Sequence, residues 1–220
     1  MAANSRGLRR TQISIVFTCL AFLTVSCGNT GRTANADETT NVPQTPDSSA
    51  QAASPVALVN LQEADEVAAW TTVNDPVMGG LSTSGISFDD GGLVFSGNIS
   101  LENNGGFAST RSPQNPDIGR RATGAEALRV HARGDGKTYL LKVGIEGQPW
   151  SYIQRFPTQP AVQRIYELPV GGFQPVGMRL DPAPDAPQAL DPSRINQVAV
   201  YILEQQGPFE ITVSMIDATA

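Results

Sequence analysis

The chain has 220 residues, a formal charge of −6 at pH 7 and two cysteines, Cys19 and Cys27, so it accommodates one ordinary domain with additional segments but not two large domains. Because both cysteines lie in the first 27 residues and His131 is the sole histidine, the composition excludes disulfides, cysteine-ligated zinc and a cysteine nucleophile from the remainder and argues against His-rich metal sites. Beyond residue 27 there is no basic run other than Arg120-Arg121, and an acidic chain repels phosphate backbones, so we expect no nucleic-acid partner.

Residues 1–26 have the features of a lipoprotein signal peptide. Three arginines within the first ten residues precede an apolar run, Ile13–Val25, which is shorter than the roughly 20 residues of a membrane span. The run ends in LTVSCG at residues 23–28, which resembles a bacterial lipobox with cleavage before a lipidated Cys27. Thr24 stands where Leu is more usual, and the alternative is an ordinary signal peptide or an uncleaved anchor with Cys27 incidental. We expect a membrane-anchored lipoprotein on the exported side, at the periplasmic face of the inner or outer membrane.

Residues 27–55 combine the lipidated cysteine with a linker. From Gly28 to Pro55 the chain is rich in Asn, Thr, Ser, Ala, Gln and Pro and has almost no large apolar residue. Such a segment cannot bury enough surface to offset its conformational entropy, so the composition predicts a flexible linker. Signal peptide, lipidation site, linker and domain follow in the order that a surface-tethered lipoprotein requires.

Residues 56–220 are predicted to form one all-β domain, a jelly-roll β-sandwich. One short helix is predicted at 61–69. Period-two alternation predicts strands at 128–133, 139–145, 198–202 and 209–215, and in the last of these Phe209, Ile211, Val213 and Met215 share one face. Weaker strands fit 81–88, 93–101, 107–111, 150–156 and 163–168. Glycine-containing turns between them favour a sandwich over a βαβ fold, and the Pro-rich segment 181–192 predicts a long loop with a short helix entered near Asp191.

Motifs that look catalytic have simpler explanations. Gly136-Lys137-Thr138 ends like a phosphate-binding loop but lies between two predicted strands, so we interpret Asp135-Gly136 as a hairpin turn with a positive φ at Gly136. His131 alternates with Arg129 and Arg133, opposite the apolar face, and no Gly-x-Ser-x-Gly is present. A surface or sheet-face histidine is therefore favoured over a catalytic base. We expect no catalytic residue, no cofactor and no metal site.

Three segments are richer in Gly, Asn and Asp than plain strand connections need. They are Trp70–Ser82, Ser96–Arg111 and Arg133–Tyr139. They carry, in order, a Trp followed by Asn-Asp-x-Val-Met-Gly-Gly-x-Ser, then Glu-Asn-x-Gly-Gly-Phe-Ala-Ser-x-Arg, then Arg-Gly-Asp-Gly-x-x-Tyr. These motifs, together with Gln206-Gly207-Pro208-Phe209 near the C-terminus, closely resemble the complex I intermediate-associated protein 30 family over about residues 67–216.

The resemblance implies a galactose-binding-like jelly roll, in agreement with the strand pattern. It also implies a role in assembly, because eukaryotic members of that family assist assembly of mitochondrial respiratory complex I and some plant relatives assist photosystem biogenesis. The family brings no established catalytic residues, so it implies a protein that is not an enzyme.

The three segments can be read in two ways. In the structural interpretation, which we favour, Gly79-Gly80 and Gly105-Gly106 allow tight turns, Asn and Asp side chains bond those turns, and Arg111 and Arg133 pair internally with Asp75 or Glu102. In the functional interpretation, the loops converge at one end of the sandwich and form a polar ligand surface. The candidate binding residues are Trp70, Asn74, Asp75, Asn104, Phe107, Arg111, Arg133 and Asp135.

Three functions remain open. The leading hypothesis is a non-catalytic, membrane-tethered binding module that acts as an assembly or stability factor for a membrane protein complex, either respiratory complex I-like or photosynthetic. Because a bacterial lipoprotein faces away from the cytoplasm, any complex I role would act on the outer side of the membrane arm. The alternative is a carbohydrate-binding module for envelope glycans with Trp150 and Tyr152 as a platform, although core burial of these rings is favoured. An enzyme is the third and weakest hypothesis.

Overall fold

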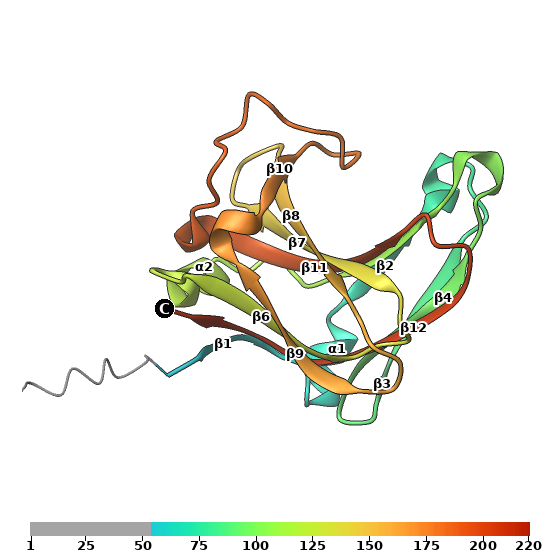
Figure 1. The fold of residues 1–220 in the computed structure, drawn as a ribbon, viewed down its shortest axis with the longest axis horizontal. Helices are drawn as coiled ribbons and strands as arrows, with labels where there is room; N and C mark the ends of the chain where they lie inside the picture. The colour runs from blue at the N-terminus through green and yellow to red at the C-terminus, as the bar shows by residue number, and fades with distance from the viewer. Residues whose placement is uncertain (1–53) are drawn as a thin grey trace, which may run out of the picture. The chain divides into compact units, whose positions relative to one another are not determined.

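The computed structural model describes residues 54–220. They form two antiparallel sheets and the connections between the strands (Figure 1). The predicted signal peptide, the lipidation site Cys27 and almost all of the predicted linker lie outside the described residues. Within residues 54–220, no helix has the length and apolar character needed to cross a bilayer. The predicted fold class, an all-β sandwich, is confirmed.

The first sheet, sheet A, has six strands in the order β3-β4-β12-β6-β9, with β1 also paired to β12. Its long central strand β12 carries the C-terminus (Figure 1). The strands are β1 (Val56–Asn60), β3 (Thr83–Asp89), β4 (Gly92–Ile99), β6 (Ala127–Arg133), β9 (Gln163–Pro169) and β12 (Gly207–Thr219).

The second sheet, sheet B, also has six strands, in the order β10-β8-β7-β11-β5-β2. They are β2 (Thr71–Asn74), β5 (Phe107–Arg111), β7 (Thr138–Ile145), β8 (Ser151–Pro157), β10 (Gln174–Val176) and β11 (Ile195–Leu203). Short helices occupy some of the connections: α1 (Ala64–Ala68), α2 (Asp117–Ala122) and the 3-10 turns η1 (Asp75–Met78), η2 (Glu102–Asn104), η3 (Val170–Gly172) and η4 (Pro192–Arg194).

The strands predicted from alternation are all present, whereas the shortest elements were not predicted. Strands β2 and β10 have four and three residues, and β10 contains a proline at its centre, so neither shows a usable period. Helix α2 contains Gly119, which lowers helix propensity. The predicted helix at 61–69 is present in shortened form as α1, and the predicted helix near Asp191 is η4, where Asp191 accepts the Ser193 amide at 3.0 Å.

The core lies between the two sheets and consists of the alternate apolar residues of both. Phe95 of β4 and Phe209 of β12 meet edge to face, with their ring centroids 4.9 Å apart. Strand β12 contributes Phe209, Ile211 and Val213 to this core, as predicted. The prediction that Met215 continues the same face is wrong, because the pairing of β12 with β6 shifts register between Val213 and Met215. A bulge of this kind inserts one residue and reverses the alternation, so Ile216 is buried instead.

The predicted turn at Asp135-Gly136 has the expected backbone but not the expected topology. Gly136 has a φ of +95°, a conformation that favours glycine. The flanking strands do not form a hairpin, however, since β6 belongs to sheet A and β7 to sheet B. The segment 134–137 therefore carries the chain from one sheet to the other.

Two groups of loops flank the outer face of sheet B (Figure 1). At one end of the sandwich, η1, η2 and the turn between β11 and β12 lie close together and rise past the sheet edge. The predicted long loop between β10 and β11 arches over the opposite part of the same sheet. The outer face of sheet B is thus bordered on two sides.

Candidate functional site

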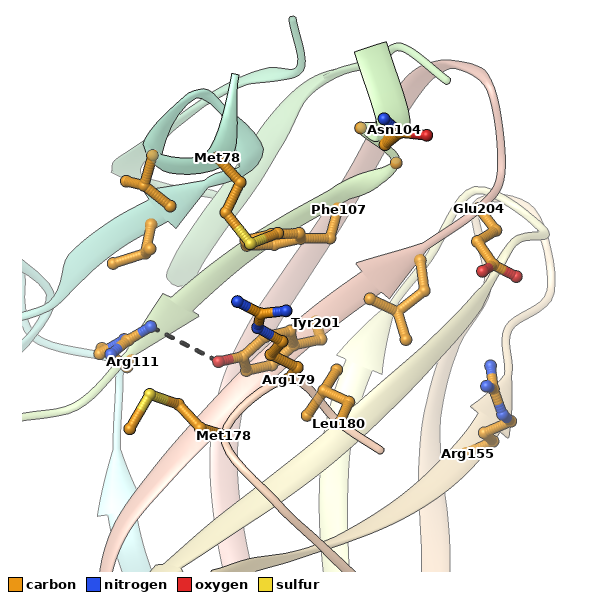
Figure 2. A pocket seen from close by; sticks show the side chains of 15 residues that line it. Met78, Asn104, Phe107, Arg111, Arg155, Met178, Arg179, Leu180, Tyr201 and Glu204 are labelled. Carbon is orange, nitrogen blue, oxygen red and sulfur yellow. Dashed lines mark hydrogen bonds between the residues drawn. The ribbon is translucent and has the colours of Figure 1, made fainter. Parts of the chain in front are cut away.

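A groove of about 730 Å³ lies on the outer face of sheet B (Figure 2). Its floor comes from β2, β5 and β11, one wall comes from η1 and η2, and the other wall comes from residues 178–180 of the β10–β11 loop. Grooves that combine apolar lining with a few polar groups are the usual binding sites of proteins. This groove is the candidate functional site.

The floor of the groove is built on a small apolar cluster. Leu140, Ala199 and Tyr201 are buried on this face, separately from the main core, and Leu180 of the long loop packs against them. The ring of Tyr201 lies 6.5 Å from that of Phe107, centroid to centroid, and Lys142 Nζ lies 5.4 Å from the Tyr201 centroid. Only 7% of Tyr201 is exposed, so its ring is part of the floor and is not a free stacking platform.

Three arginines line the groove. Arg111 points from β5 toward Tyr201, and its Nη2 donates to the tyrosine hydroxyl at 3.4 Å (Figure 2). The Nε of Arg111 is buried and has no hydrogen-bond partner among the described residues. Arg155 of β8 and Arg179 of the long loop also contribute. None of the three forms an ion pair within residues 54–220, although Glu204 lies at the same groove.

Apolar side chains project at the rim. Met178 is 86% exposed and Val77 is 73% exposed, and Met78 is also largely exposed. All three line the groove. Exposed side chains of this size, gathered at one groove, typically mark a surface that contacts another molecule.

The wall formed by η1 and η2 is held by a buried carboxylate. Asp75 is fully buried. Its carboxylate accepts the Ser82 amide at 2.8 Å, the Ser82 hydroxyl at 2.5 Å, the Gly106 amide at 2.6 Å and the Phe107 amide at 3.1 Å. Burial by itself raises the pKa of Asp75, but the hydrogen bonds from Ser82, Gly106 and Phe107 outweigh it, so the pKa lies below its ordinary value.

Two glycines of the sequence motifs make room for this carboxylate. A Cβ on Gly80 would overlap the Asp75 carboxyl carbon, and one on Gly105 would lie 2.8 Å from Asp75 Oδ2. The first and second motifs therefore form one structural unit around Asp75, which we call the Asp75 junction (Asp75, Gly80, Ser82, Gly105 and Gly106). It fixes the position of the groove wall.

The eight residues predicted as binding-loop residues occupy different places. Asn104, Phe107 and Arg111 line the groove. Asn74 and Asp75 are engaged in the wall itself, since the Asn74 amide hydrogen-bonds the Ser84 hydroxyl at 2.6 Å.

The other three lie away from the groove. Trp70 is buried in the main core. Arg133 pairs with Asp90, not with Asp75 or Glu102, and Asp135 accepts the amides of Lys137 and Glu210.

The sequence motifs do not contain several groove residues that the fold supplies. Tyr201, Arg155 and Met178 come from β11, β8 and the long loop, far from the motifs in sequence. Alternation places Arg155 opposite the buried Phe156, which identifies an outward position, but nothing in the sequence indicates that this face is the one with a groove. The Trp150 and Tyr152 pair is not a platform either, because Tyr152 is buried and its hydroxyl donates to the Pro187 carbonyl at 2.8 Å.

His131 belongs to a charge cluster on the outer face of sheet A. The buried Asp217 accepts Arg129 Nε at 2.7 Å and Nη2 at 2.6 Å, and His131 Nε2 lies 2.9 Å from its second oxygen. Burial by itself raises the pKa of Asp217, but the hydrogen bonds from Arg129 and His131 outweigh it, so the pKa lies below its ordinary value. Within residues 54–220, no group of His, Cys, Asp and Glu side chains is arranged to hold a metal ion.

Comparison with protein families gives one match that spans most of the domain. The model of the family described as complex I intermediate-associated protein 30 matches residues 59–213. A search of curated proteins finds no match to this chain.

Comparison with solved structures finds similarity to carbohydrate-binding modules. The family 11 module of the cellulase Lic26A-Cel5E of Clostridium thermocellum aligns with a TM-score of 0.55 and 13% identity, covering 77% of this chain and 96% of that chain. A family 11 module of the same organism, in complex with a β-1,3-1,4-mixed-linked tetrasaccharide, aligns with a TM-score of 0.49 and 14% identity, covering 72% of this chain and 94% of that one. At such identities the first likeness shows a shared fold and nothing about the ligand.

Proposed function

The chain belongs to the complex I intermediate-associated protein 30 family, and on this premise we propose that it is an assembly or stability factor that holds a subunit of a membrane protein complex, respiratory complex I-like or photosynthetic. The docking site in this proposal is the groove on the outer face of sheet B. The observation that carries it is the joint presence of exposed Met and Val side chains and three arginines around one groove. The family motifs support this location, because the Asp75 junction positions one wall of the groove.

The composition of the groove favours a protein partner. Met, Arg and aromatic residues are enriched where proteins meet, and their contacts contribute most of the binding energy there. Methionines adapt their shape to a partner at little cost because the side chain is unbranched and flexible. The exposed Met78 and Met178 stand at the η1 wall and the loop wall, so a partner chain between them would bury both.

A glycan ligand is the alternative, and the groove favours it less. The structurally similar modules are named for carbohydrate binding, but the likeness extends to the fold alone. Sugar rings are commonly held against exposed aromatic faces, whereas Tyr201 is nearly buried with Lys142 over its ring. Among residues 54–220, Glu204 is the one carboxylate that lines the groove, so the acceptors that usually bind sugar hydroxyls are also scarce there.

We further propose that Cys27 carries the lipid that keeps this domain at the exported face of the membrane. The lipobox-like LTVSCG and the preceding arginines support this tether. A Cys27→Ala protein should leave the membrane fraction after a salt wash. If it remains there, the lipid anchor is refuted and the N-terminal run acts as an uncleaved membrane anchor.

The docking site is tested by site-specific photo-crosslinking in native membranes. A benzophenone amino acid replaces Met178 at the groove in one protein and Ile165, an exposed residue on β9 of sheet A, in a matched control. We expect the Met178 position alone to capture subunits of a respiratory or photosynthetic complex, identified by mass spectrometry. Capture of such subunits from Ile165 alone, or equally from both positions, would place docking elsewhere, and capture of no complex subunit from either would refute the assembly role.

A further inference from the structure

We propose that the segment bound in the groove is an extended, acidic peptide in which carboxylates alternate with apolar side chains. This inference rests on the proposed function, in that it takes the outer face of sheet B as the docking site, and it specifies the chemistry of the occupant. It is argued from the placement of four cations, the register of sheet B and the apolar rim.

The cations on this face are unpaired within the described residues. Arg111, Lys142, Arg155 and Arg179 stand on or over the outer face of sheet B, and no carboxylate lies within ion-pair distance of any of them in residues 54–220. Ion pairs do form elsewhere in the same domain, as between Arg129 and Asp217 or Arg133 and Asp90. In a protein with a net charge of −6, a set of unpaired cations at one groove attracts an anionic ligand and raises its association rate.

Arg111 has spare donors directed at the groove. A guanidinium has five N–H donors in a planar fork that matches a carboxylate. Within residues 54–220, the one side-chain hydrogen bond of Arg111 is the long one, 3.4 Å, from Nη2 to the Tyr201 hydroxyl. The remaining terminal N–H donors of the guanidinium are free for a ligand carboxylate, which can accept two of them at once.

The register of sheet B sets the spacing of the ligand's charges. Arg111 pairs with Ala199, Ala199 with Lys142, and the next row runs through Tyr201 and Leu140 to Arg155. Arg111 on β5 and Arg155 on β8 are thus three strand spacings apart across the sheet, about 14 Å, and one row apart along it, about 7 Å, which gives about 16 Å in all. An extended chain advances roughly 3.3 Å per residue, so a peptide that crosses the strands presents carboxylates to both arginines when they are about four to six residues apart, on the same face.

The rim accounts for the apolar part of the ligand. Met78 and Met178 are exposed beside the arginines and offer no hydrogen-bonding groups that a sugar or a phosphate would use. Apolar side chains at positions next to the carboxylates would cover these methionines. An acidic peptide with interspersed apolar residues therefore uses both kinds of group, whereas an acidic polysaccharide leaves the methionines uncovered.

The test selects binders without assuming a sequence. A phage library of random dodecapeptides is panned on the full-length chain, and a fluorescein-labelled copy of the most enriched peptide is titrated by anisotropy. We expect enriched peptides to carry Asp or Glu about four to six residues apart among apolar residues, and affinity to fall roughly tenfold or more in Arg111→Gln/Arg155→Gln. The matched control, Arg164→Gln/Arg194→Gln, removes the same charge from exposed arginines that line neither wall nor floor of the groove, and it should bind normally.

Several outcomes overturn the inference. Enrichment of neutral or basic peptides whose binding depends on Met178 would keep the groove and refute the acidic ligand. Absence of any binder, or affinity equal in both double variants, would refute a peptide held by these arginines. Retardation of the chain in a gel containing polygalacturonate, without peptide binders, would assign the groove to an acidic glycan. The photo-crosslinking from Met178 is independent of all three, so the proposed function and the ligand class can fail separately.

Discussion

The carboxylate of Asp75 accepts the amide of Gly106 at 2.6 Å, which joins two loops whose residues lie 31 positions apart in the sequence. Gly106 in turn accepts the Glu204 amide through its carbonyl at 2.7 Å, so the β11–β12 turn joins the same junction. The most distinctive part of the sequence therefore serves first to fix the end of the sandwich that forms one wall of the groove.

Replacing Asp75 should destabilise the domain severely. In Asp75→Ala, the amides of Ser82, Gly106 and Phe107 lose their acceptor, and each buried donor left unsatisfied costs about 1–3 kcal/mol. We expect the free energy of unfolding to fall by about 3 kcal/mol or more, measured by urea denaturation followed by circular dichroism. Asp185→Ala, at an exposed position of the β10–β11 loop, should change it by less than about 0.5 kcal/mol. Unchanged stability of Asp75→Ala combined with lost binding would show instead that Asp75 contacts the ligand.

Gly80, beside this carboxylate, should also be intolerant of substitution. In Gly80→Ala the new methyl group overlaps the carboxyl group of Asp75, and overpacking of this kind costs about 1–3 kcal/mol. Gly85 in β3 is the control, because a Cβ there meets no atom within 4 Å and its φ is not positive. Thermal unfolding should show a lowered midpoint for Gly80→Ala and no loss for Gly85→Ala. Equal midpoints would mean that the junction yields more easily than its contacts indicate.

Acid should unfold the domain through two buried carboxylates. The pKa values of Asp75 and Asp217 both lie below the ordinary 3.8, so the unfolded chain takes up these protons first as the pH falls. Their contribution to stability is complete above the unfolded-state pKa of about 4 and is lost as the pH falls through the lower folded-state values. Urea denaturation between pH 7 and pH 3 should show stability that is level above about pH 5 and declines steeply below about pH 4.

The Asp217 part of this acid dependence can be isolated by substitution. Asp217→Asn should be less stable than the natural protein at pH 7, because Arg129 loses its charged partner, and should lose less stability on acidification. A variant with the full acid-induced loss would assign the titration to other groups.

Tyr152 should act as an anchor for the loop that forms the second wall. Its hydroxyl donates to the Pro187 carbonyl of the β10–β11 loop at 2.8 Å and lies 3.4 Å from the Ala189 carbonyl of the same loop, and Tyr152→Phe removes only these contacts. We expect a stability loss of about 0.5–1.5 kcal/mol and faster amide hydrogen exchange confined to residues 177–191. Exchange that stays unchanged in this loop would show that packing of Leu180 and Leu190 holds it without the tyrosine.

How far the sequence alone leads depends on whether the relevant signal is local. The strands at 128–133, 139–145 and 209–213 were predictable because burial on one side of a sheet imposes a period of two on neighbouring residues. Internal bonding of Asn74 and Asp75 was expected from Asx side chains at Gly-rich turns, but their partners were not predictable, because Asp75 reaches the amide of Gly106, 31 positions away. The partner of Arg133 was not predictable, since Asp90 reaches it across sheet A from the turn between β3 and β4.

The sequence by itself determined that residues 56–220 form an all-β sandwich, that they carry three motifs of one family, and that they contain no cysteine and one histidine, His131. Each of these follows from residue types and local spacing. Only the tertiary structure decided which motif residues face a groove and which lie in its wall, that Met215 turns out of the core at a bulge, and that Arg111, Arg155 and Arg179 meet on one face. Those facts depend on which strands become neighbours, and strand pairing across sequence separations of tens of residues leaves no periodic trace in the chain.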